Sequence, residues 1–120
     1  MPARRTRGVT VAQVVAAAKK LPGVEESVSY RTRALKVKGK LIARFKDDER
    51  TLVLRSSFED RAHLMTVDPK AFFLEDHYHG HPYVLIRIAA LPGTMLPDLL
   101  EDAWRRVAPP TLLKAKDTTT

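Results

Sequence analysis

The sequence predicts a single two-layer α+β domain, an antiparallel sheet with helices on one face, in the order α-β-β-β-α-β-β-α. Three segments carry apolar residues at helical spacing, and five short segments carry strand patterns. Short turns join the first three of these strands, as in an antiparallel meander. Helices with one apolar stripe and strands with one apolar face are buried together most simply in two layers. A length of 120 residues suits one such domain.

The first helix is predicted from Thr10 to the Pro22-Gly23 pair. Thr10 and Gln13 have the spacing of a capping box, and Pro22-Gly23 is a typical helix end. Its apolar face consists of Val11, Val14, Val15, Ala18 and Leu21. We expect residues 1–9 to be a disordered basic arm and residues 24–28 to be an acidic connector.

Three strands follow, at residues 35–37, 41–45 and 52–54. Leu35 and Val37 alternate with lysines, and Leu41 and Ala43 continue the same parity after the Lys38-Gly39 turn. The alternating apolar residues of these strands are predicted to face the helices, which places Leu41 in the core and Ile42 on the opposite side. Asp47-Asp48 is the turn into the third strand.

The second half of the domain contains a helix, two strands and a last helix. Ser57 is a predicted N-cap, and Asp68-Pro69 ends that helix. Strands are predicted at residues 71–74 and 83–88, the latter apolar enough to be central. The last helix covers residues 95–107 and contains Trp104, and Pro109-Pro110 stops it. The domain is thus expected over residues 10–110, followed by a flexible tail at 111–120.

Composition excludes several classes of chemistry. The chain has no Cys, which rules out disulfides, thiolate zinc sites and Cys nucleophiles. No apolar run is long enough for a bilayer, and no signal peptide is recognisable, so we expect a cytoplasmic location without a membrane partner. A net charge of +7 favours encounters with polyanions, of which nucleic acid is the most abundant in a cell.

The positive charge is concentrated on the first three predicted strands. Residues 31–55 contain nine basic and three acidic residues. Several of the basic residues alternate with the apolar residues along the strands, so they would lie together on the opposite, solvent-facing side of the sheet and make it cationic. The predicted phosphate-contacting residues are Arg31, Arg33, Lys36, Lys38, Lys40 and Arg44. The alternative is a solvated face whose lysines protect an edge strand from aggregation.

A His-x-His-x-His segment is the other local signal. On an extended chain, His77, His79 and His81 would point to one side and could bind Zn²⁺ or Ni²⁺. The alternative is a polar loop between strands, because Gly80 and Pro82 break strand regularity. We predict no resident cofactor and no enzyme activity, since no catalytic motif is present. The set Ser56, Ser57, Asp60 and His63 is better explained by helix capping and helix surface.

Three segments together resemble a known family. They are Leu21-Pro22-Gly23-Val24-Glu25-Glu26, the Lys36-Val37-Lys38-Gly39-Lys40-Leu41-Ile42-Ala43 hairpin and the Trp-bearing helix at 99–107. In this order and spacing they resemble the MmcQ/YjbR family over about residues 10–110. The resemblance implies a secretion-chaperone-like fold and DNA binding through basic hairpins. That family usually has a Trp in the fifth-strand region, where this chain reads His79-Gly80-His81-Pro82-Tyr83-Val84, so Tyr83 is its candidate replacement.

Three function hypotheses follow. The first is a non-enzymatic module that binds DNA or another polyanion with a basic sheet face. The second is a homodimeric protein-interaction or chaperone-like module, which the fold resemblance suggests. The third is a small-molecule or metal site at the loop of residues 77–81.

Overall fold

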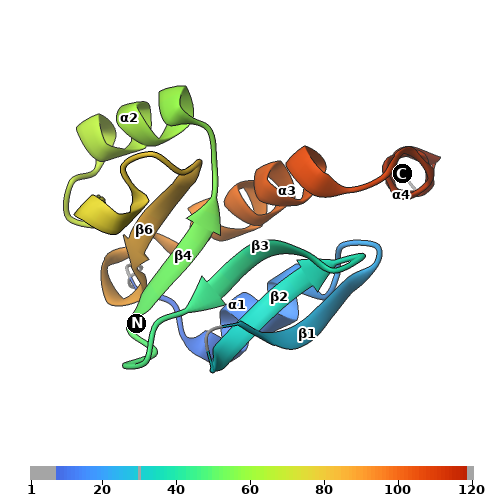
Figure 1. Ribbon diagram of the computed structural model, residues 1–120, viewed down its shortest axis with the longest axis horizontal. Coiled ribbons are helices and arrows are strands. Elements are labelled where there is room, and N and C mark those ends of the chain that lie inside the picture. Colours follow the sequence, from blue (N-terminus) through green and yellow to red (C-terminus); the bar gives the residue numbers. More distant parts are fainter. Residues whose placement is uncertain (1–7, 30, 119–120) are drawn as a thin grey trace.

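The computed structural model describes residues 8–29 and 31–118, and Figure 1 labels most of the elements that they form. In chain order these are α1 (Val11–Ala18), β1 (Val24–Ser29), β2 (Thr32–Val37), β3 (Lys40–Phe45), β4 (Thr51–Arg55), α2 (Phe58–Val67), β5 (Phe72–Phe73), η1 (Asp76–Tyr78), β6 (Tyr83–Arg87), η2 (Ile88–Ala90), η3 (Gly93–Met95), α3 (Leu96–Val107) and α4 (Pro110–Thr118). The expected α+β class is confirmed.

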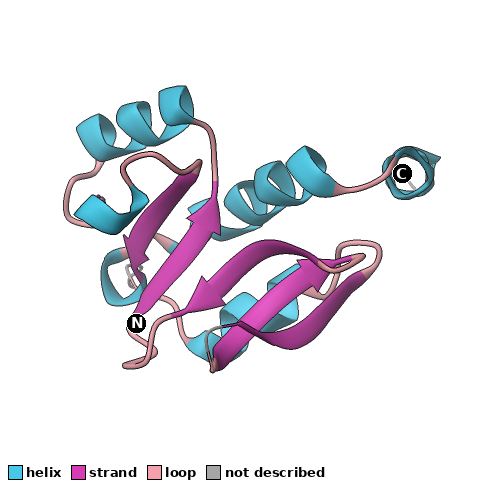
Figure 2. Ribbon diagram, in the orientation of Figure 1, coloured by secondary structure: helices cyan, strands magenta, loops and turns pink. Residues whose placement is uncertain are grey.

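One six-stranded antiparallel sheet has the order β1-β2-β3-β4-β6-β5. Helices α1 and α3 pack against each other, and α3 also packs on β3 and β4. Figure 2 shows both helices behind the strands, so that β1 to β3 are uncovered on the near side. The main core lies between this sheet and these helices, with Trp104 fully buried. The predicted capping box of α1, made by Thr10 and Gln13, is present.

The segment predicted as an acidic connector is strand β1, so that part of the prediction is wrong. Glu25 lies opposite Lys36, and Glu26 pairs with Arg33 at 3.6 Å. An edge strand has a neighbour on one side only and is mostly exposed here, so it lacks the apolar alternation by which strands are recognised. Cross-strand charge pairs of this kind favour the register.

A β-bulge in β3 changes the side on which its first residues lie. Leu35 lies opposite Ala43, but Lys36 lies opposite Leu41, so Ile42 is the extra residue. Ile42 and Ala43 are both fully buried, whereas Leu41 is only half-buried. The expectation that Leu41 faces the core and Ile42 the opposite side is therefore wrong, because one extra residue inverts the parity of everything before it.

The chain continues as a helix beyond the predicted stop at Pro109-Pro110. Pro110 begins α4, where a missing N–H and a pre-set φ cost nothing. Leu112 and Leu113 of α4 pack against the main core. The loose tail expected from residue 111 is therefore helical over the residues that the structure describes.

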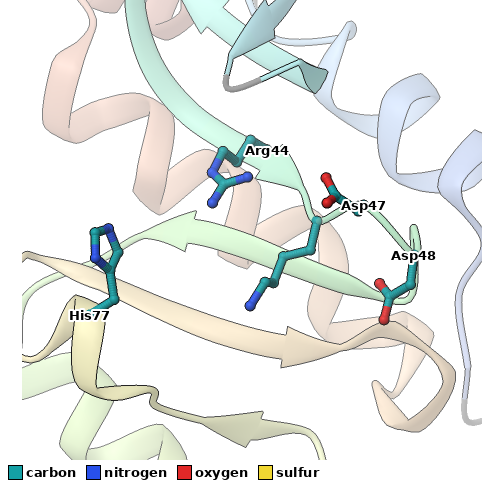
Figure 3. Close-up of a pocket in the computed structure, with 5 residues that line it drawn as sticks. Arg44, Asp47, Asp48 and His77 are labelled. Atoms are coloured by element: carbon teal, nitrogen blue, oxygen red, sulfur yellow. The ribbon is translucent and has the colours of Figure 1, made fainter.

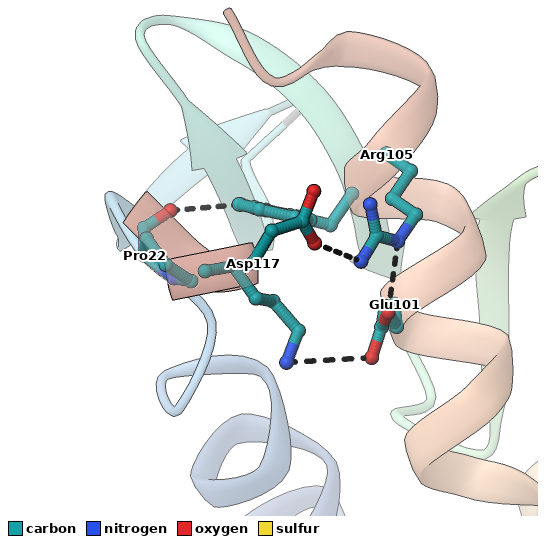
Figure 4. A network of polar contacts seen from close by, with 6 residues as sticks. Pro22, Glu101, Arg105 and Asp117 are labelled. Atoms are coloured by element: carbon teal, nitrogen blue, oxygen red, sulfur yellow. Dashed lines mark hydrogen bonds and ion pairs between the residues drawn. The ribbon is translucent and has the colours of Figure 1, made fainter. Parts of the chain in front are cut away.

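Polar contacts fasten α4 to α3, and α3 to the turn after α1 (Figure 4). Arg105 bridges Glu101 at 2.8 Å and Asp117 at 3.1 Å, and Lys116 lies 3.6 Å from Glu101. Beneath them the indole Nε1 of Trp104 donates to the carbonyl of Pro22 at 2.7 Å.

At the amino end, the predicted disordered arm falls mostly on residues 1–7, which lie outside the described residues. Its last two members are held in the fold. Gly8 N donates to Leu91 O at 2.7 Å, and Val9 N donates to Ile88 O at 2.8 Å. The Val9 side chain belongs to the main core.

Across residues 8–29 and 31–118, none of the helices combines the length and the apolar character that a bilayer crossing requires.

Candidate functional site

The sheet face opposite α1 and α3, here called the outer face, carries the candidate sites. Cross-strand partners share a face, so the pairs Lys36–Leu41, Arg44–Val53 and Val53–Leu85 place these residues together on it. Over β4 and β6 the outer face is covered by residues 74–83, and Val53, Leu85 and Tyr78 form a second small core there.

The structure distributes the six predicted phosphate-contacting residues over three places. Lys36 and Arg44 lie on the outer face. Lys38 and Lys40 form the tip of the β2–β3 hairpin. Arg31 and Arg33 lie at the other end of β2. The single cationic face expected from strand parity is not assembled as one surface.

The cations at the far end of β2 lie beside carboxylates. Arg33 is 3.6 Å from Glu26 and 3.8 Å from Glu49. Arg31 borders an open hollow whose lining also includes the acidic turn at residues 47–49. Arg33 shares the parity of buried Leu35, so it lies at the margin of the helix-covered face. These neighbours reduce the local positive potential.

Arg44 is half-buried and is held in place by hydroxyl groups. Its Nη2 donates to the Tyr78 hydroxyl at 2.6 Å, and its Nη1 donates to Thr32 Oγ1 at 3.3 Å. The guanidinium thereby joins β2, β3 and the loop after β5. Its position suits a defined pocket better than a solvated phosphate-binding face.

The lysines of the hairpin tip, unlike the half-buried Arg44, are exposed to solvent. Lys38 and Lys40 are exposed, with Gly39 between them in the left-handed region at a φ of +80°. No carboxylate of the described residues forms an ion pair with either lysine. Beside them runs a groove of about 550 Å³, here called the hairpin groove, lined by Lys38, Lys40, Arg106 and the α3–α4 linker.

The hairpin groove is cationic along its length. Three cations and no carboxylate occur among the described residues that line it. One of the three, Arg106, is ion-paired with Asp60 of α2. Pro109 and Pro110 line the groove opposite the lysines, which makes that wall stiff.

The histidine segment is not extended. Asp76–Tyr78 forms the 3₁₀ turn η1, so alternate residues do not share a side. The rings of His77 and His81 lie 6.1 Å apart, with no contact of this kind to His79. Within the described ranges, no three His, Asp or Glu residues are grouped as a metal would require. The premise of the metal-site alternative is therefore wrong.

Arg61 of α2 organises this loop, and the sequence reading did not identify it. Its side chain is 6% exposed and donates to four backbone carbonyls, those of Tyr78, His79, His81 and Tyr83, at 2.6–3.0 Å. Phe58 stacks on the guanidinium, with 4.7 Å from Cζ to the ring centroid. A buried arginine in an amphipathic helix has no sequence signal, because the carbonyls that bind it are about twenty residues away.

The loop and the outer face enclose a pocket of about 240 Å³, here called the outer-face pocket. Its lining consists of Leu41, Arg44, Val53, His77, Tyr78, His81 and Tyr83. It adjoins a more open space of about 470 Å³ that shares Arg44 and His77 with it. Figure 3 shows Arg44 and His77 on opposite sides of that space, with Asp47 and Asp48 at its end.

The geometry can now be compared with that of known proteins. The YjbR family model matches residues 19–106, from the end of α1 to nearly the end of α3. The chain belongs to the YjbR family.

Relatives of this YjbR chain occur in mycobacteria. Uncharacterized protein Mb2600 of Mycobacterium bovis and Uncharacterized protein Rv2570 of Mycobacterium tuberculosis are each 35% identical to it over 52 residues. The match covers 43% of this chain and 40% of each relative, so it spans about two-fifths of the relatives' length.

A solved structure has the same fold. The crystal structure of Deinococcus radiodurans protein DR2400, described as a DUF419 domain, superposes with a TM-score of 0.73 at 20% identity. The superposition covers 88% of this chain and 86% of that one. At this identity the likeness concerns the fold of the YjbR chain alone.

Three of the four Ser, Asp and His residues weighed as a catalytic set line a further pocket of the YjbR chain, between α2, α3 and β4. Its lining includes Ser56, Asp60 and His63. The Ser57 hydroxyl accepts the Asp60 N–H at 3.0 Å as the helix cap, and the Asp60 carboxylate pairs with Arg106. No hydrogen bond joins Ser56 to His63 in the part of the chain that the structure describes.

Proposed function

We propose that this YjbR-family protein binds nucleic acid through phosphate contacts made by the β2–β3 hairpin. The observation that carries the proposal is the hairpin tip itself, where the exposed Lys38 and Lys40 border a groove whose described lining has three cations and no carboxylate. Phosphate contacts require accessible cations and give affinity without reading sequence. A cytoplasmic location is part of this proposal.

The structure changes the expected contact set. Lys38, Lys40 and Arg106 border one groove, and Lys36 follows on the outer face two residues from the turn. Arg31 and Arg33 lie beside carboxylates, and Arg44 does not line the hairpin groove, so we assign these three no primary contact with the nucleic-acid backbone. Because Arg106 is ion-paired with Asp60, we count Lys36, Lys38 and Lys40, which predicts about three phosphate contacts.

The proposal predicts a steep but limited salt dependence. Three neutralised phosphates give a slope of about −2.7 in log affinity against log salt, which is about a 40-fold loss between 50 and 200 mM salt. Fluorescence anisotropy with labelled duplex DNA, single-stranded DNA and RNA over a salt series measures the slope. No binding at low salt, or equal binding to heparin, would contradict a dedicated nucleic-acid site.

A charge-matched pair of variants locates the surface. The double variant Lys38→Gln/Lys40→Gln should lower affinity at least about tenfold and reduce the slope by nearly two. The control Arg50→Gln/Lys70→Gln removes the same net charge from exposed residues away from the hairpin groove and should lower affinity much less. Equal losses in both doubles would mean generic attraction to the net charge.

The homodimer alternative has less support. Among residues 8–29 and 31–118, the large apolar side chains that are strongly exposed are Val28 on β1 and Phe58 and Val67 at the two ends of α2. They are divided between two elements, and Phe58 is already stacked on Arg61. Light scattering at high concentration tests this alternative, and a strict monomer would remove it.

A further inference from the structure

We propose that the outer-face pocket binds a small planar aromatic ring that carries one anionic group, a carboxylate or a phosphate. This site is separate from the hairpin groove, with which it shares no lining residue. The inference therefore goes beyond nucleic-acid binding and does not depend on it.

The floor of the pocket is apolar. Val53 is fully buried in the sheet, and Leu41 lies on the outer face because of the bulge at Ile42. Without the bulge, the regular alternation would direct Leu41 into the main core. Because Val53 is fully buried, the half-buried Leu41 supplies the accessible apolar surface of the floor for one face or edge of a ring.

Aromatic side chains form the wall. Tyr78 is 7% exposed, and its ring meets that of Tyr83 edge to face at a centroid distance of 6.0 Å. The His77 ring meets Tyr78 in the same edge-to-face manner at 4.8 Å. Aromatic rings favour such edge and offset arrangements with a further planar ring, whereas a saturated ring gains less.

The charge of the lining selects an anion. Arg44 gives the lining a positive charge, His77 and His81 add ring nitrogens, and none of the described residues that line the pocket is a carboxylate. Arg44 and His77 also border the adjoining space, so a group placed between them can reach out of the pocket (Figure 3). A guanidinium is suited to carboxylate and phosphate oxygens.

The far end of the adjoining space limits ligand size and charge. Asp47 and Asp48 lie there. Lys46 also lines the space but is paired with Glu75 at 2.6 Å, so a second anionic group beside the two aspartates would be repelled. The enclosed part and the open part together fall in the range of about 300–1,000 Å³ that is usual for small-molecule sites. A single ring with one anion fits these limits better than a polyanion.

The site is organised before any ligand arrives. Arg61 holds the backbone of the loop from four carbonyls, and Arg55 donates to the Tyr83 hydroxyl at 3.1 Å while lying 5.2 Å from its ring centroid. Arg55 also donates to Leu41 O at 2.9 Å, which ties the floor to the wall. Little conformational freedom is then lost on binding.

The test compares matched probes by two-dimensional NMR of the labelled protein. The probes are benzoate, phenyl phosphate, neutral benzamide and non-planar cyclohexanecarboxylate, each at up to about 10 mM because ligands of this size bind weakly. We expect benzoate or phenyl phosphate to shift the methyl signals of Leu41 and Val53. Whichever of the two binds more tightly identifies the anion.

The two other probes can overturn the proposal. Benzamide binding as tightly as benzoate would remove the anionic requirement, and cyclohexanecarboxylate binding equally would remove the aromatic one. The proposal also fails if no probe shifts the Leu41 or Val53 signals. These readouts use the unaltered protein, so they do not depend on a variant that folds.

Variants assign the anion contact. Arg44→Gln should weaken binding of the preferred probe about tenfold or more, because a hydrogen bond to a charged group is lost. Lys38→Gln/Lys40→Gln should leave probe binding unchanged, although it should abolish most nucleic-acid affinity. Unchanged binding by Arg44→Gln would overturn the proposal. If that variant does not fold, Leu41→Phe provides a second test, because it fills the pocket without removing a charge and should prevent the probe from binding. Unchanged probe binding by Leu41→Phe would also overturn the proposal.

Discussion

Arg61 shows at the scale of one residue how a cation can be structural without an ion pair. None of the described carboxylates pairs with it, and four carbonyl dipoles take the place of water. The planar guanidinium suits this task because its donors spread in a fixed fork, which an ammonium group cannot imitate. One side chain thereby sets the path of residues 78–83 and the wall of the outer-face pocket.

Replacing Arg61 with Met should destabilise the protein by about 3 kcal/mol, because several buried carbonyls lose their donor while the side-chain volume is nearly kept. Urea denaturation measures the change. Arg61→Lys should cost less, since it keeps the charge but loses the fork. A control, Arg50→Met, alters an exposed arginine and should be nearly neutral. Wild-type stability of Arg61→Met would mean that the loop does not need the guanidinium.

Asp102 of α3 is a second residue whose surroundings predict a measurable effect. It lines the pocket between α2 and α3. Desolvation raises the pKa of Asp102 above its ordinary 3.8, the nearby Arg106 opposes this, and Asp60, Asp98 and Glu101 add to the rise. The folded state therefore holds the proton to a higher pH than the unfolded state does, so folding stability falls as pH rises through that interval.

Asp102→Asn should therefore be slightly more stable than the wild type at pH 7, and the difference should vanish at a pH below 3.8. Thermal denaturation of both proteins at the two pH values measures it. Asp98→Asn is the control and should lower folding stability at pH 7, because Asp98 lies in the first turn of α3, where a negative charge favours the helix. A stability gain for Asp102→Asn that persists at low pH would contradict the assignment.

At the scale of elements, the junction between α1, β1 and α4 depends on Gly23. Its φ is +76°, and a Cβ placed there would lie 2.6 Å from Leu112 Cδ1 of α4. Gly39, in the hairpin tip, has a similar φ of +80° but open space around it. Adding a Cβ would strain the left-handed backbone at both positions, but only at Gly23 would the Cβ also clash with a neighbouring side chain.

Gly39→Ala should cost about 1–2 kcal/mol from the left-handed backbone alone, and Gly23→Ala should cost more because Leu112 must move. Chemical denaturation of both variants gives the comparison. In a Leu112→Ala background, Gly23→Ala should cost no more stability than Gly39→Ala does. A double-mutant cycle of Gly23→Ala and Leu112→Ala measures this coupling. Equal costs at the two glycines, with or without Leu112, would show that α4 does not pack there as described.

Elements also differ in how far their sequence predicts them. Helix α1 has an apolar stripe and a capping box, and helix α3 has an apolar stripe, so their positions could be predicted. Strand β1 and helix α4 are stabilised by other elements: β1 by pairing with β2, and α4 by Leu112, Leu113 and the contacts of Arg105. Local patterns do not contain such partners, and both elements were missed.

For the whole molecule, the charge distribution decides which functions are accessible. The sequence places most of the positive charge between residues 31 and 55, but folding divides it into a carboxylate-lined end, a hydroxyl-bound arginine and an open hairpin tip. The hairpin tip keeps the exposed cations on which the proposed nucleic-acid binding depends. The resulting molecule offers two sites of different chemistry, a cationic groove and an aromatic pocket.

By itself, the sequence determined the α+β class, the antiparallel sheet, the amphipathic helices and the family, because these follow from local periodicity and from short segments in a set order. Tertiary structure alone decided which side Leu41 faces, that Arg61 is buried, and that the predicted cations are separated. One physical reason is that side chains alternate between the two faces of a sheet only while strand pairing is regular. The other is that ion pairs and buried hydrogen bonds join residues that are far apart in the chain. A single extra residue at Ile42 was enough to turn a predicted core side chain into the floor of a pocket.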